Sequence, residues 1–132
     1  MEIAFSVPGE PVAKQRPRLG RNNNTYTPDR TRQAEQTIAW AYKAAAQADG
    51  IAARSDTLIE LAAVFLYAKR DKDIDNMLKT VLDGLNDIAW DDDKQVVRVM
   101  GYKVQVPADQ AGTHVIVKQY DHTSTQKVTD AQ

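Results

Sequence analysis

Two runs of aspartate lie close together on either side of one amphipathic segment of this chain. They comprise Asp71, Asp73 and Asp75 on one side and Asp91, Asp92 and Asp93 on the other. Carboxylates packed together repel one another unless a cation lies among them, and hard divalent cations prefer oxygen ligands. The two runs therefore predict a Mg²⁺ site, and protein-bound Mg²⁺ commonly contacts phosphate groups.

The segment between the runs has the spacing of a helix that begins after Asp73. Its apolar residues fall on one face: Ile74, Met77, Leu78, Val81, Leu82, Leu85 and Ile88. Asp75, Lys79 and Asp83 fall at i, i+4 and i+8 on the polar side. A strand–helix–strand layout allows Asp93 to meet Asp73 and Asp75. Carboxylates that met there would hold one or two Mg²⁺ ions, with Lys79 beside the reacting phosphodiester.

Each of these carboxylates also has an ordinary structural interpretation. Asp73 fits a helix N-cap, Asp75 fits a partner of the helix dipole, and Asp91–Asp93 fits a solvated turn. Asp75 and Lys79 fit a surface ion pair worth roughly 0.3 kcal/mol. All of these features within one short span favour a functional site. A calcium-binding EF-hand is excluded, because Asn76 replaces its glycine and Leu82 its bidentate glutamate.

Composition narrows the functional classes. The 132 residues include no cysteine, which excludes disulfides, thiolate zinc sites and a cysteine nucleophile. The net charge is −1, yet Pro8 to Arg32 holds six basic residues against two acidic ones. A basic arm on an acidic body predicts a bound polyanion, although solvated basic loops are equally common. No secretory signal and no apolar run of about 20 residues is present, so we expect a cytoplasmic protein.

The predicted elements alternate between strands and helices. Strands are expected at 2–7, 57–67, 95–106 and 113–120, and helices at 28–49 and from residue 74 onward. The sequence therefore predicts a small single α+β domain with a mixed four-stranded sheet, two main helices and the order β-α-β-α-β-β. The domain is expected to span 1–120, with a basic DNA-binding arm at about 8–27 and a flexible tail at 121–132.

Several details of packing follow from the same patterns. The helix at 28–49 should start with Thr27 as N-cap and present the small residues Ala34, Ala41 and Ala45 beside Ile38 for close packing.

Strand 57–67 is apolar on both faces, so it should be central and covered on both sides, by helices or by a second subunit. In strand 95–106, Val96, Met100 and Tyr102 should share one face, with a bulge at Gly101. The last two strands, 95–106 and 113–120, should pair with each other as a hairpin. The basic arm shows neither helical nor strand periodicity in its apolar residues. Trp40 and Trp90 are expected in the core or in an interface.

The acidic segments resemble the RusA family of Holliday junction resolvases. The matching residues are Arg70-Asp-Lys-Asp-Ile-Asp-Asn, Lys79, Leu82-Asp-Gly-Leu and Trp90-Asp-Asp-Asp-Lys-Gln-Val96. The resemblance covers residues 57–106 well. It extends more loosely to Pro11–Arg18, which is similar to the arm of Gram-positive and prophage members.

The resemblance implies a crossover junction endodeoxyribonuclease of recombination and repair. It makes Asp73, Asp75 and Asp93 metal ligands and Lys79 the catalytic lysine, with Asn76 and Asp92 as supporting neighbours. The cofactor would be Mg²⁺, for which Mn²⁺ can substitute, and a homodimer would cut two opposing strands of a four-way junction. The candidate phosphate contacts are Lys14, Arg16, Arg18 and Arg21.

Two other functions are compatible with parts of the sequence. One is a module that binds branched DNA without cleaving it, although a pure binder gains nothing from a repulsive carboxylate cluster. The other is an acidic interaction protein with no role on nucleic acid. The charged arm and the spacing of the motif argue against it.

Overall fold

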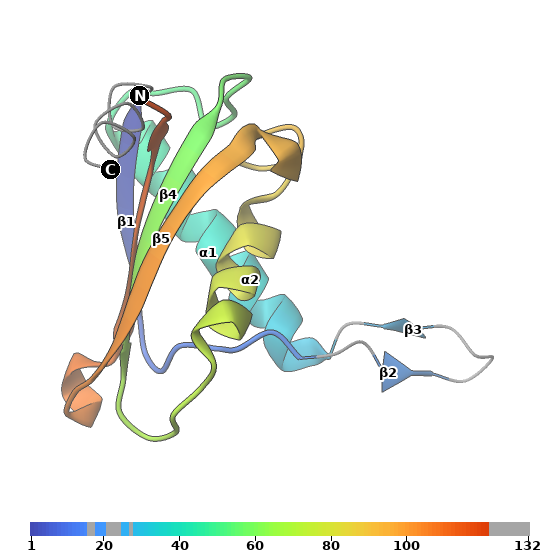
Figure 1. The fold of residues 1–132 in the computed structure, drawn as a ribbon, viewed down its shortest axis with the longest axis vertical. Coiled ribbons are helices and arrows are strands. Elements are labelled where there is room, and N and C mark those ends of the chain that lie inside the picture. The colour runs from blue at the N-terminus through green and yellow to red at the C-terminus, as the bar shows by residue number, and fades with distance from the viewer. Residues whose placement is uncertain (16–17, 21–24, 27, 122–132) are drawn as a thin grey trace, which may run out of the picture.

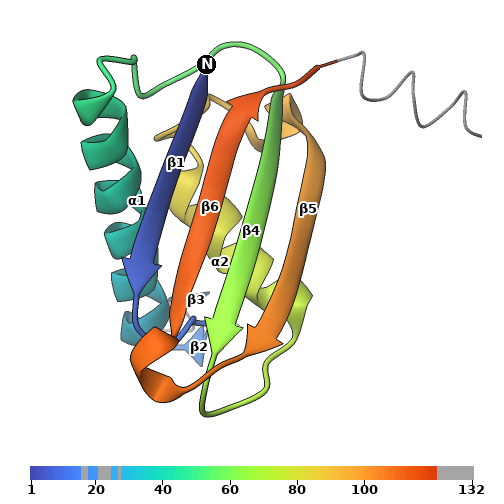
Figure 2. The same cartoon turned by 90° about the vertical axis from the view of Figure 1, so that its left-hand side faces the viewer.

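A sheet of four strands carries two helices on one of its faces (Figures 1 and 2). The computed structural model describes residues 1–15, 18–20, 25–26 and 28–121. Its elements in chain order are β1 (Glu2–Pro8), β2 (Arg18–Leu19), β3 (Thr25–Tyr26), α1 (Asp29–Ala48), β4 (Ile59–Tyr67), α2 (Ile74–Leu85), η2 (Asp93–Gln95), β5 (Val96–Gln105), η3 (Ala108–Gln110) and β6 (Gly112–Gln119). The predicted class and the order β-α-β-α-β-β of the main elements are confirmed. No helix within these ranges is long and apolar enough to cross a membrane.

The strands lie in the order β1-β6-β4-β5, as Figure 2 shows. β5 runs parallel to β4, because α2 carries the chain back to the end of the sheet where β4 begins. β6 then runs antiparallel between β1 and β4. The predicted hairpin of the last two strands is therefore wrong. The apolar β4 gains a neighbour on each side this way, which leaves β5 at the edge.

The core lies between the sheet and the two helices. Met77, Val81 and Leu85 of α2 are fully buried there, and burial of each such side chain stabilises the fold by about 1.5–3 kcal/mol. A Cβ at Gly84 would lie 3.0 Å from the backbone oxygen of Glu35, so α2 and α1 pack at close range. The close packing predicted for the first helix is thus confirmed.

Some boundaries and faces of the first helix differ from the prediction. The residues of α1 that are most buried are Thr31, Ile38, Tyr42 and Ala46, whereas Ala41 and Ala45 lie at the margin of the core. Pro28 occupies the N-cap position. The predicted cap, Thr27, lies outside the described residues.

The two tryptophans have opposite environments. Trp90 is fully buried, as expected of a core residue, whereas 77% of Trp40 is exposed on α1. Trp40 is therefore not a core residue.

An irregularity in β5 changes which of its residues face the helices. Val96 pairs with Ile59 and Arg98 pairs with Glu60, so the register shifts at Val97 and not at Gly101. Val96 consequently faces the helices, whereas Met100 and Tyr102 face the other side, and the prediction of one shared face is wrong. Gly101 instead allows α2 to approach, since a Cβ there would lie 3.2 Å from Leu78 Cδ2.

The basic segment is more regular than its sequence suggests. β2 and β3 pair as a short antiparallel ribbon, set apart from the main sheet near the start of α1 (Figure 1). Arg18 lies in β2. Arg16, Arg21 and residues 122–132 lie outside the described residues.

Candidate active site

A groove of about 500 Å³ runs between α2 and the start of β5. One wall is the polar stripe of α2, formed by Asp75, Lys79 and Asp83. The rest is lined by Asp93 and by the apolar side chains Leu78, Leu82, Val96 and Val99. The structure therefore brings Asp75, Lys79 and Asp93 to one groove from opposite ends of the helix connection. Asp73 does not line this groove and lines a different pocket instead.

Two carboxylates where the chain enters α2, Asp73 and Asp75, form few hydrogen bonds with the rest of the described residues. Asp73 occupies the N-cap position, but its side chain accepts no capping hydrogen bond. Asp75 Oδ1 accepts a hydrogen bond from Asn76 N at 2.9 Å. Among the described residues Lys79 forms no ion pair within 4.0 Å, so the alternative interpretation of Asp75 and Lys79 as a surface ion pair does not hold there. Asp73 thus makes no side-chain cap and Lys79 makes no ion pair there, whereas Asp75 does lie in the first turn of α2, where a carboxylate favours the helix dipole.

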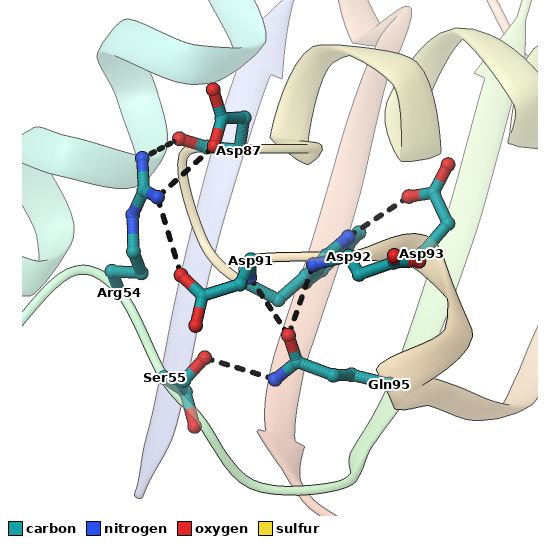
Figure 3. Close-up of polar contacts among 8 residues, drawn as sticks. Arg54, Ser55, Asp87, Asp91, Asp92, Asp93 and Gln95 are labelled. Atoms are coloured by element: carbon teal, nitrogen blue, oxygen red, sulfur yellow. Dashed lines mark hydrogen bonds and ion pairs between the residues drawn. The ribbon is translucent and has the colours of Figure 1, made fainter.

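In the exit segment, which follows α2 and runs from Asp91 to Gln95, each aspartate has a different partner (Figure 3). Asp91 Oδ1 pairs with Arg54 Nη1 at 3.2 Å. Asp92 Oδ1 accepts a hydrogen bond from Lys94 N at 2.8 Å and caps the short helix η2. Asp93 Oδ1 accepts one from Trp90 Nε1 at 2.9 Å. Only Asp93 of the three lines the groove, so the run is not a uniformly solvated turn.

Gln95 anchors this exit segment to the chain before β4. Its Oε1 accepts hydrogen bonds from Asp91 N at 2.8 Å and Asp92 N at 3.0 Å. Its Nε2 donates to Ser55 O at 3.0 Å and Thr57 O at 2.9 Å. One amide side chain therefore fixes the turn that carries Asp93. Its place in the sequence motif was noted, but not this role.

Glu10 anchors the entrance segment, which runs from Ala68 to Asp75 and leads from β4 into α2. Its carboxylate accepts hydrogen bonds from Ala68 N at 3.0 Å and Lys69 N at 3.1 Å, and Lys72 Nζ lies 3.2 Å away. Burial alone would raise the pKa of Glu10, but these hydrogen bonds and the Lys72 charge lower it below its usual value. The loop between β4 and Asp73 is therefore held by a residue 58 positions upstream of Ala68 in the chain, which sequence spacing could not reveal.

Lys14 joins the base of the basic arm to both helices. Its backbone N–H donates to Asn76 O at 2.9 Å, and its Nζ lies 2.6 Å from Glu35 Oε1 and 3.0 Å from Asp83 Oδ2. Burial by itself would lower the pKa of Lys14, but the two carboxylates outweigh it and raise that pKa. A phosphate contact by Lys14 stays a prediction, and the structure places its ammonium against Glu35 and Asp83.

A lysine that sequence analysis missed approaches the entrance segment from β5. Lys103 Nζ pairs with Asp71 Oδ1 and donates to Lys72 O at 2.9 Å. The hydrogen bond from Lys103 lowers the pKa of Asp71, and the same bond raises the pKa of Lys103. The charge of Asp73 also helps to raise the pKa of Lys103, but the ion pair itself is made with Asp71.

Comparison with known protein families gave a match over most of the chain. The family model for the endodeoxyribonuclease RusA matches residues 8–118. The chain belongs to the RusA family. The match includes the root of the basic arm, both acidic segments and the groove, and it makes DNA cleavage the family activity. No curated protein matched the chain.

The donors in the groove of this RusA-family chain are of the kind that Mg²⁺ prefers. Asp75, Asp83 and Asp93 contribute carboxylate oxygens to the groove. In the part of the chain that the structure describes, no three carboxylate or imidazole groups stand close enough together to hold an ion. The fit therefore lies in the chemistry of the donors and their shared groove, and not in a preformed cage.

Proposed function

We propose that the chain is a Mg²⁺-dependent, structure-specific endonuclease that cuts Holliday junctions and other branched DNA. The observation that carries this proposal is the shared groove, which holds Asp75, Lys79 and Asp93 together. DNA cleavage is the activity of the family, and the choice of branched DNA follows the family resemblance of the motif. Such cleavage serves recombination and repair.

The chain's own residues divide the chemistry between them. Asp75 and Asp93 of the groove would hold Mg²⁺, or Mn²⁺ in its place, together with Asp73, whose side chain would have to turn from the pocket that it lines. The bound ion would supply an activated water and charge stabilisation at the scissile phosphate. Lys79 places a positive charge in the groove beside the developing negative charge on the phosphate oxygens. Trp90 orients Asp93 through its hydrogen bond, as outer partners of metal ligands commonly do. Asn76 would contribute through its backbone carbonyl, which accepts a hydrogen bond from Lys14 N. Asp92 would contribute by capping the short helix η2, which begins at Asp93.

Basic residues beside Asp73 support a path for the DNA backbone. The pocket that Asp73 lines also holds Arg30, Lys69, Arg70 and Lys72. It opens next to the root of the arm, where Arg16, Arg18 and Arg21 follow Lys14. These side chains would hold phosphates, so binding should weaken steeply as salt rises.

A homodimer completes the proposal. One groove makes one nick, whereas separating a four-way junction requires a nick in each of two opposing strands. Two copies of the chain would provide the two sites.

The test is cleavage of a synthetic four-way junction labelled in turn on each of its four strands. We expect paired, symmetric nicks with Mg²⁺, none with EDTA, and little cutting of the matched linear duplex. Tight binding to the junction without nicks under Mg²⁺ would overturn the nuclease proposal. That result would favour the alternative, a module that binds branched DNA without cleaving it.

A further inference from the structure

In the part of the chain that the structure describes, the face of the sheet that turns away from the helices is largely apolar and has no element packed over it. Figure 2 looks onto this face, with α1 and α2 behind the sheet. On β5, Met100 is 45% and Tyr102 is 59% exposed, and on β6 Ile116 is 42% exposed. Exposed apolar surface that is continuous over several strands marks an interaction site in most proteins.

One row of this face is charged, with signs that alternate from strand to strand. The register aligns Glu2 with Lys118, Lys118 with Glu60, and Glu60 with Arg98. Lys118 Nζ lies 3.2 Å from Glu60 Oε1, and Arg98 Nη1 lies 3.5 Å from Glu60 Oε2. Across β1, β6, β4 and β5 the row therefore reads negative, positive, negative, positive.

Glu60, in the middle of that row, is not fully satisfied within one copy of the chain. Only 4% of its side chain is exposed, and in the described residues its Oε1 accepts no hydrogen bond of good geometry. Buried carboxylate oxygens normally have donors, because desolvation of an unbonded charge is costly. Within one copy, Glu60 therefore depends on its ion pairs with Lys118 and Arg98, which places both cations of the row on this face of the sheet.

We infer that a second copy of the chain packs on this face, with the two-fold axis parallel to the strands and between β6 and β4. This inference rests on the homodimer of the proposed function and adds its surface and orientation. Such an axis lays β1 over the partner's β5 and β6 over its β4. At the level of the row, each strand then meets a strand of opposite charge, with β6 (Lys118) over the partner's β4 and β1 (Glu2) over the partner's β5.

Other orientations and other partners fit this face less well. An axis across the strands would set the charged row against the apolar end of the face, around Leu66 and Val104, or against itself with like charges opposed. DNA or an anionic membrane would require an excess of positive charge, whereas this row is neutral. The groove with Asp75 and Lys79 lies on the helix side of the sheet, so the dimer leaves both grooves open.

The surface is tested by sedimentation equilibrium on the full chain. We expect a dimer for the unaltered protein, and at least ~100-fold weaker association for Tyr102→Glu, which would bury two unpaired carboxylates in the interface. Trp40→Glu is the matched control, because Trp40 is even more exposed but lies on α1, and it should leave the dimer intact. A Tyr102→Glu protein that still dimerises would overturn the proposed surface. Paired nicking by the unaltered protein would then keep the proposed function standing.

The orientation is tested by cross-linking, and it does not depend on Tyr102. The chain has no cysteine, so introduced thiols are unique. In the row next to the charged one, Ala4 and Met100 stand on the outer strands, roughly 14 Å apart across the sheet. A bismaleimide with a spacer shorter than that width should link the Ala4→Cys/Met100→Cys double variant into covalent dimers and leave both single variants unlinked. Dimers from Ala4→Cys alone would place β1 over the partner's β1 and overturn the orientation.

Discussion

The two acidic segments around α2 look alike in the sequence but differ in the structure. In the exit segment every aspartate has a partner: Arg54 for Asp91, the turn backbone for Asp92, and Trp90 for Asp93. In the entrance segment Asp71 is paired with Lys103, while Asp73 accepts no capping hydrogen bond. The exit segment is therefore a rigid turn that presents one carboxylate, and the entrance segment keeps two carboxylates available.

This difference shows that a run of aspartates need not share one role. Of the three consecutive residues Asp91, Asp92 and Asp93, two stabilise the turn and one lines the groove. The two segments are also held in different ways. Gln95 fixes the exit turn locally, whereas Glu10 fixes the entrance loop from the first strand's end.

The largest expected effect within the exit segment comes from Asp93→Asn. The amide oxygen can still accept the hydrogen bond from Trp90, so the fold should persist while the charge in the groove is lost. Cleavage of a four-way junction should fall by ~10³-fold or more, the scale set by loss of one preorganised electrostatic group. Asp91→Asn is the matched control and should cut within a few fold of the unaltered protein. Equal losses in both variants would mean that the turn acts as a single acidic patch.

Trp90→Phe should have an intermediate effect. It removes the Nε1–H donor to Asp93 and keeps most of the buried aromatic volume. Loss of an outer partner of a metal ligand typically costs 10–100-fold in activity or metal affinity. The Mg²⁺ concentration for half-maximal cleavage should therefore rise by about that factor. A purely structural role would lower the stability to urea and leave this Mg²⁺ midpoint unchanged.

The smallest expected effect is a decrease in the free energy of unfolding when Glu10 is protonated at acid pH. Its pKa is lowered in the folded chain, so its stabilising contribution is present above the ordinary glutamate range and is lost as pH falls through the lowered value. The free energy of unfolding in urea should decline by about 1 kcal/mol on this account as the carboxylate is protonated. Glu10→Gln should be less stable near neutral pH and show a flatter dependence below about pH 4. Identical pH profiles for the two proteins would exclude this role of Glu10.

Local patterns in the sequence were sufficient for the main helices and strands and for the presence of Asp75, Lys79 and Asp93 along one helix connection. The helical spacing from Ile74 to Leu85 predicted α2, and the motif placed Asp75, Lys79 and Asp93 among the site residues. The sheet order was not predictable in full. Alternation within β5 and β6 identifies each as a strand, but it does not say that β6 pairs with β4 and not with β5. The bulge at Val97 was missed for a similar reason, because it depends on pairing with β4.

The contacts of Glu10, Lys14 and Lys103 could not be predicted from the sequence, because they join segments that are far apart along the chain. The partners of Glu10, Lys14 and Lys103 lie 21 or more residues away along the chain. No spacing rule links residues so far apart, so only the fold reveals that they fix the entrance segment and the arm. The buried Glu60 is another such case, since its partners lie on two neighbouring strands.

The central claim is that the carboxylates of this groove perform metal-dependent DNA cleavage, and Asp75→Asn tests it most directly. The amide oxygen that this substitution introduces can still accept the hydrogen bond from Asn76 N, so the change removes a charge with little structural cost. Binding and cleavage of one labelled four-way junction should be measured side by side, with Mg²⁺ for cleavage and without it for binding. The account predicts that Asp75→Asn binds the junction like the unaltered protein and makes no nicks. Unchanged nicking by Asp75→Asn would contradict it.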